Sequence, residues 1–143
     1  MNMADAVSVW GAVVSTTLGI LRLVDAWRDR GRIEVSFSFH GDPYEGNDVI
    51  IRNLASKPLV IVYWELVWRH KRRLRWVESK NKKMSADQDF IDKKLEGYGT
   101  WVLTFSEADY FDWGWKAMGN DSIYLRLHFA GKKRPLVRKV YPV

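Results

Sequence analysis

The sequence contains few side chains of catalytic or metal-binding type at the spacings of known catalytic or metal-binding motifs. The histidines His40, His70 and His128 are far apart, and none lies in a metal-binding spacing such as H-E-x-x-H. The chain has no cysteine, no phosphate-binding glycine loop and no G-x-S-x-G sequence. We therefore expect no catalytic residue, no metal site and no cofactor, and we predict that the protein is not an enzyme.

Two groups of acidic side chains are the remaining candidates for acid-base or metal chemistry. They are Asp87, Asp89 and Asp92, and Glu107, Asp109 and Asp112. Their spacing is more simply that of solvated faces and, for the second group, of the first turn of a helix, where carboxylates are favoured by the helix dipole. We expect both groups to be surface charges.

Basic side chains concentrate in one short stretch that also carries Trp68 and Trp76. We predict that it contacts an anionic surface through Arg69, Lys71, Arg72, Arg73, Arg75, Lys82 and Lys83. Three explanations compete for this stretch. Anionic lipid headgroups attract such a loop, a nucleic acid or nucleotide would use its charge and stacking surface, and an edge hairpin is protected from aggregation by charge.

A second candidate surface is the aromatic run from Tyr110 to Trp115. Ser106 with Asp109 three residues later predicts a short helix that reaches about Met118. On such a helix, Phe111, Trp115 and Met118 share a face that can close one end of a β-sandwich. Tyr110 and Trp113 then lie on another face, where an exposed Trp113 would anchor a partner or enter the membrane interface. We predict aromatic contacts through Trp76, Tyr110 and Trp113.

The N-terminal helix determines where in the cell these surfaces are placed. Residues 6–24 are almost wholly apolar and would span about 28 Å as a helix, close to the thickness of a bilayer core. Arg22 lies near the end, where an arginine can reach the headgroups. Lipid, partner helices or the rest of the chain must cover this surface, and we expect a single-pass or membrane-embedded helix. The alternative is a helix folded onto its own β-domain or into a soluble oligomer.

The charges that flank the helix predict its orientation. Arg22, Arg28, Arg30 and Arg32 all lie on its C-terminal side, which places the N-terminus outside and the β-domain in the cytoplasm. A signal peptide is disfavoured because Asp5 precedes the apolar stretch and no Lys or Arg does. The alternative localisation is cytoplasmic without a membrane.

Small residues form a narrow seam on the same helix. Gly11, Ala12, Ser15 and Gly19 have the spacing that lets two membrane helices approach closely, so we predict a helix-association face and a homo-oligomer. Small residues are also common in any membrane helix, and this second explanation stays open.

After residue 30 the hydrophobic period changes from about 3.6 to 2, which is typical of half-buried strands. Strands are expected at 33–39, 49–54, 59–68, 89–95, 100–105, 123–129 and 136–141, with a hairpin tip at 69–73. This pattern predicts a mainly β fold: an immunoglobulin-like β-sandwich, or a small barrel, of about seven to eight strands, with an N-terminal apolar helix and one short internal helix. The domains are 1–30, the helix, and 31–143, the β-sandwich.

Four short stretches give the chain a resemblance to a known group of proteins. They are Trp27 to Arg32, Asn53 to Pro58, Leu95 to Trp101 and Gly131 to Arg134. With them the chain resembles small uncharacterised bacterial and phage proteins that join an N-terminal membrane helix to an immunoglobulin-like sandwich. The resemblance implies this architecture and no catalytic residue.

Composition is consistent with a binding role. The chain of 143 residues has a net charge of +6 and a pI near 9.6, which favours acidic partners. We therefore expect a non-catalytic, membrane-anchored cytoplasmic interaction module that binds a protein partner or itself, as a bacterial or phage accessory factor. The lipid bilayer and its anionic headgroups are the expected surroundings. The alternative is a soluble basic domain that binds nucleic acid or a nucleotide and oligomerises through its helix.

Overall fold

A computed structural model describes residues 3–28, 32–72, 75–86 and 91–142. Within these ranges the chain forms a helix, α1 (Met3–Arg28), followed by eight strands and two short helical turns. The strands are β1 (Ile33–Phe39), β2 (Asn47–Asn53), β3 (Leu59–Arg72), β4 (Arg75–Ser85), β5 (Lys93–Leu95), β6 (Thr100–Phe105), β7 (Asp121–Phe129) and β8 (Leu136–Tyr141). The turns are the 3-10 helix η1 (Glu107–Asp109) and the single-turn helix α2 (Trp115–Met118).

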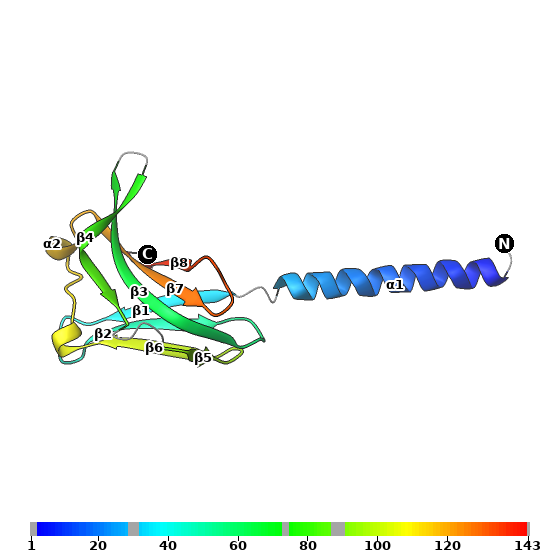
Figure 1. Ribbon diagram of the computed structural model, residues 1–143, viewed down its shortest axis with the longest axis horizontal. Coiled ribbons are helices and arrows are strands. Elements are labelled where there is room, and N and C mark those ends of the chain that lie inside the picture. Colours follow the sequence, from blue (N-terminus) through cyan, green and yellow to red (C-terminus); the bar gives the residue numbers. More distant parts are fainter. Residues whose placement is uncertain (1–2, 29–31, 73–74, 87–90, 143) are drawn as a thin grey trace.

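The strands form two antiparallel sheets that pack face to face (Figure 1). One sheet has the order β1-β2-β6 and the other β4-β3-β7-β8, with β5 pairing to the first part of β3. Lettered in the immunoglobulin manner, these orders are A-B-E and C′-C-F-G. The predicted immunoglobulin-like sandwich is therefore confirmed, and the described strands do not close into a barrel.

Alternating side chains build the core between the sheets. In β2, residues 47, 49, 51 and 53 are buried while the residues between them are partly exposed, which is the period-2 burial of a strand with one covered face. Leu66, Ile123, Leu125 and Leu127 of the facing sheet are also fully buried. Together they form one hydrophobic core, as expected for a single sandwich domain.

Strand β3 is central to its sheet and longer than the sequence predicted. It pairs with β7 on one side and with β4 and β5 on the other. The predicted hairpin tip at 69–73 was placed too early, because residues 69–72 continue β3 and pair with residues 75–78 of β4. Its outer face is covered by charged side chains of β4 and β7 that bind Glu65.

Two turns from distant parts of the sequence are locked together at the end of the sandwich where β1 begins. The side-chain amide of Asn53, which is fully buried, donates to the carbonyl oxygens of Lys57 (2.8 Å) and Glu96 (3.0 Å). The Tyr98 N–H donates to the Ala55 carbonyl at 3.1 Å. The two turns contain the Asn53–Pro58 and Leu95–Trp101 stretches of the resemblance, and their role is structural.

The helix predicted between Ser106 and Met118 is wrong in extent. The chain instead makes η1, runs extended past Phe111, and turns once at α2. Ser106 makes no capping hydrogen bond. Phe111 and Met118 are buried as expected, whereas Trp115, predicted on the same buried face, is 81% exposed.

Candidate functional site

Helix α1 leads away from the sandwich (Figure 1), and its residues 8–25 are all exposed. It contains one stretch, Ser8–Asp25, that is long and apolar enough to cross a membrane, and none of that stretch is buried. At 1.5 Å per residue, its 18 residues span about 27 Å. The sandwich therefore does not cover the apolar surface of its own helix.

Two of the polar side chains in this stretch are satisfied within the helix. The hydroxyls of Thr16 and Thr17 donate to the carbonyls of Ala12 and Val13, each at 2.8 Å. Such back-bonding removes the need for water at these hydroxyls and lowers their cost in lipid. The predicted association residues Gly11, Ala12, Ser15 and Gly19 are all exposed, and a Cβ on either glycine would meet no described atom within 4 Å.

The basic hairpin divides into paired cations at its base and exposed ones toward its tip. Arg69 binds Glu78 at 2.6 Å and Lys83 binds Glu65 at 2.5 Å. Lys82 lies 3.7 Å from Asp121 and donates to the Ala117 carbonyl at 2.6 Å. Three of the predicted anion-contacting residues thus already have acidic partners.

The remaining members of the predicted surface lie toward the tip. Lys71 and Arg75 are exposed and form no ion pair with a described residue, whereas Arg73 and the side chain of Arg72 lie outside the described part of the chain. Trp76 is 53% exposed and contacts the Tyr124 ring edge-on at 5.9 Å. The Arg69 guanidinium lies 5.3 Å from the centre of the same Tyr124 ring. Aromatic and basic groups therefore do meet on the outer face of this sheet.

Behind the hairpin, a network of charges joins three strands. Glu65 of β3 is buried and accepts from Lys83 and, at 2.6 Å, from Arg126 of β7. Glu78 of β4 binds both Arg126 and Arg69. Burial raises the pKa of Glu65, but hydrogen bonds from Lys83 and Arg126 outweigh it and the pKa is lowered. The Arg69 hydrogen bond lowers the pKa of Glu78. Both carboxylates are ionised at neutral pH and act as structural anchors for the cations.

Tyr110 and Trp113 are held by the sandwich. The Tyr110 hydroxyl and the Trp113 indole N–H both donate to the His40 carbonyl, at 3.0 and 3.2 Å. Trp113 also packs against Phe39 and Tyr141, with ring centres 5.9 and 5.7 Å away. Both side chains are partly buried, and the most exposed aromatic ring of the segment is that of Trp115.

The histidines and acidic groups remain dispersed in the fold. His40 lies 3.3 Å from Glu45, His70 lies 3.4 Å from Asp121, and His128 lies 4.0 Å from Glu65. Within the described ranges, no three histidine or acidic side chains are grouped to hold a metal ion. Asp87 and Asp89 lie outside those ranges.

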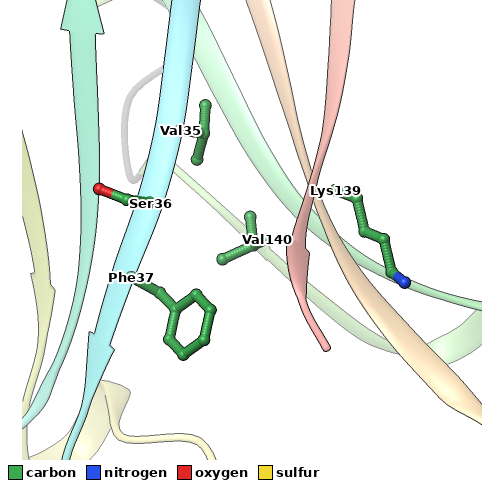
Figure 2. Close-up of a pocket in the computed structure, with 5 residues that line it drawn as sticks. All are labelled: Val35, Ser36, Phe37, Lys139 and Val140. Carbon is green, nitrogen blue, oxygen red and sulfur yellow. The ribbon is translucent and has the colours of Figure 1, made fainter. Parts of the chain in front are cut away.

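An apolar groove separates the edges of the two sheets. Val35 and Phe37 of β1 and Val140 of β8 point into it, while Ser36 and Lys139 point away (Figure 2). Its volume is about 360 Å³. A second hollow of about 290 Å³ lies between β4 and the segment before α2, with Trp68, Met84 and Phe111 among its lining residues. Each is large enough for a few side chains of a partner.

The fold and these surfaces define an immunoglobulin-like sandwich that carries an uncovered apolar helix. No protein-family model matches the chain, and no curated protein matches it. Among solved structures, the chain is similar to the solution structure of a protein described as late embryogenesis abundant (LEA). The identity is 16%, the match covers 95% of this chain and 83% of that one, and the TM-score is 0.33.

Proposed function

We propose that the protein is a membrane-anchored, non-catalytic interaction module. The observation that carries this proposal is the uncovered surface of α1, since the Ser8–Asp25 stretch is apolar, sufficiently long and in contact with no part of its own sandwich. Exposed apolar area of this extent is unfavourable in water, so lipid or other helices must cover it. The N-terminus lies outside and the sandwich lies in the cytoplasm, following the four arginines on the C-terminal flank.

The surface offered to a protein partner is the far end of the β3–β4 hairpin. Lys71 and Arg75 are unpaired there among the described residues, and Trp76 supplies an exposed ring beside them. Arginine and tryptophan are enriched where protein interfaces derive most of their affinity. The partner's surface is therefore acidic, with a recess that accepts an aromatic side chain.

The competing function is a soluble nucleic-acid-binding domain that oligomerises through α1. The exposed side chains of Lys71, Arg75 and Trp76 favour it. However, other cations of the hairpin already have acidic partners, which reduces the charge available for phosphates: Arg69, Lys82 and Lys83. It would also require α1 to be covered by copies of itself.

Membrane flotation of the full chain tests the proposal, with two arginine variants of α1. A charge at mid-helix costs about 2.5 to 3.5 kcal/mol in a bilayer, whereas one near a helix end reaches the headgroups. The Leu18→Arg chain should therefore be released from membranes by an alkaline wash. The Val9→Arg chain, with its arginine at the edge of the same stretch, should remain bound to them. A wild-type chain that remains soluble without detergent, as a uniform oligomer, would instead support the competing function.

A further inference from the structure

Four separate segments meet at the end of the sandwich to which α1 connects. Ile33 pairs with Asn53, Leu59 with Leu95, and Ile61 with Phe129. Arg32 and the turns 54–58, 96–99 and 130–135 therefore lie at one end, here called the proximal end. In Figure 1 this is the end that faces α1. Only residues 29–31 separate α1 from Arg32, a span of at most about 14 Å.

The proximal end is strongly basic. Its four segments contain five exposed basic side chains: Arg32, Lys57, Lys132, Lys133 and Arg134. None of the five forms an ion pair with a described acidic residue. The single acidic residue, Glu96, is bound by Lys94 of β5 at 2.8 Å. Lys132 lies 5.1 Å from the centre of the Phe129 ring, a contact that leaves its charge unneutralised. All five charges are therefore available to an anionic surface.

Two apolar side chains project among these cations. Leu54 is 47% exposed and Tyr98 is 74% exposed. Their backbone is fixed, because the Leu54 N–H donates to the Arg32 carbonyl at 2.8 Å and the Tyr98 N–H donates to Ala55. Tyr98 also has a φ of 57°, in the left-handed region that favours glycine or asparagine. A tyrosine and a leucine between lysines and arginines match the interface of a bilayer, where aromatic rings lie at headgroup depth.

The opposite, distal end of the sandwich body has the reverse charge. The connections 40–46 and 106–120 carry five exposed acidic side chains and one lysine: Asp42, Glu45, Glu107, Asp109, Asp112 and Lys116. The outer part of the β3–β4 hairpin, past the pairing of His70 with Asp121 at the start of β7, projects to the side of the sandwich (Figure 1). The 14 residues of β3 amount to about 46 Å of strand between the proximal end and the outer part of the hairpin, several times the Debye length of about 8 Å.

We propose that the proximal end is a docking surface for anionic lipid headgroups. Arg32, Lys57 and the 132–134 run contact the headgroups, and Tyr98 and Leu54 enter the interface. The proposal rests on the proposed anchoring of α1, which holds this end beside the bilayer. Docking fixes the orientation of the sandwich, with its acidic end directed away from the membrane and the hairpin projecting to one side (Figure 1).

Site-specific labelling of the full chain tests this surface. Because the chain has no cysteine, Ala130→Cys in the proximal 130–135 turn and Tyr44→Cys in the distal 40–46 turn each give one labelling site. The labelled chains are reconstituted into phosphatidylcholine vesicles with or without 30 mol% phosphatidylglycerol, and a headgroup-attached nitroxide serves as quencher. We expect quenching at Cys-labelled position 130 to rise at least twofold with anionic lipid and to fall in 1 M salt, with no change at position 44.

Two charge variants of equal size show which surface is responsible. Lys132→Gln/Lys133→Gln/Arg134→Gln should abolish the lipid-dependent quenching, and Lys71→Gln/Arg72→Gln/Arg75→Gln should leave it unchanged. The opposite pattern would overturn the proposal in favour of the hairpin, and equal quenching in both kinds of vesicle would overturn it outright. Flotation with phosphatidylcholine vesicles reports anchoring alone. A chain that floats but shows no lipid-dependent quenching fails only the docking proposal, and one that floats with neither vesicle fails both.

Discussion

The buried carboxylate of Glu65 holds two cations against the outer face of the sheet. Removing its charge while keeping its shape leaves Lys83 without its carboxylate partner and leaves Arg126 with Glu78 alone. A hydrogen bond to a charged group contributes about 1.5 to 3 kcal/mol, so Glu65→Gln should lower the free energy of unfolding by about 2 kcal/mol. Urea unfolding of the full chain in mild detergent measures this.

The matched control is Glu34→Gln, which removes an exposed carboxylate 3.7 Å from Arg52. Exposed pairs contribute at most about 1 kcal/mol, and often nothing measurable. Equal losses in the two variants would mean that burial of Glu65 adds nothing to its pairing.

The same carboxylates give the stability a defined dependence on pH. The pKa values of Glu65 and Glu78 are lowered in the folded chain from an ordinary value of 4.5. Their contribution is therefore complete above pH 4.5 and is lost as the pH falls below it, since the unfolded chain takes up the protons first. Replacing both residues by glutamine should flatten the unfolding free energy below pH 4.5 relative to wild type. If the unfolding free energy of the double variant still falls below pH 4.5 as steeply as that of wild type, other carboxylates cause the loss of stability in acid.

At the scale of elements, the contact between the turns 54–58 and 96–99 depends on a missing side chain. A Cβ at Gly97 would lie 2.0 Å from the carbonyl oxygen of Ser56. Because that neighbour is backbone, one of the two turns must move. Gly97→Ala should therefore cost at least about 2 kcal/mol of stability and lower the thermal midpoint. Gly41→Ala is the control, since its Cβ would meet nothing within 4 Å, and it should be neutral.

Local patterns predicted those elements whose burial alternates regularly. Strand β1 was predicted with the bounds that it has, because Ile33, Val35, Phe37 and Phe39 alternate with polar residues. The end of β3 was misplaced because a run of basic residues resembles a solvated turn. Those cations continue as strand since Glu78 lies opposite Arg69 on the neighbouring strand, a pairing across nine residues.

The helix expected at 106–118 failed for a similar reason. The segment is fixed by contacts with the last residue of β1 and the residue after it, which are far away in the sequence. Tyr110 and Trp113 donate to the His40 carbonyl, and Phe111 packs on Phe39 at 5.3 Å. These contacts favour extended backbone over helix. The basic proximal end could not be predicted from the sequence, because its cations lie in four separate segments between Arg32 and Arg134.

At the scale of the whole molecule, apolar and charged surfaces are arranged in order with increasing distance from α1. An apolar helix is followed by a basic end, an apolar core and an acidic end, and a basic hairpin projects from the side of the sandwich (Figure 1). An anionic bilayer would stabilise this arrangement, because lipid surrounds α1, the headgroups attract the basic proximal end, and the membrane charge repels the acidic end. This order links the anchoring proposal to the use of the hairpin as the surface that meets a partner.

The flanking charges should then determine the topology of the chain in a cell. With the natural flanks, Tyr44→Cys should react with a membrane-impermeant maleimide only in broken cells, because the proposed topology places the sandwich in the cytoplasm. Replacing Arg28, Arg30 and Arg32 with glutamine and inserting three lysines after Met1 reverses the charge bias across α1. Position 44 should then be labelled in intact cells. Three glutamines inserted at the same place, with the arginines kept, control for the length of the insertion. Labelling of the natural-flank chain in intact cells would refute the cytoplasmic assignment, whereas labelling that never depends on the flanks would refute charge as its cause.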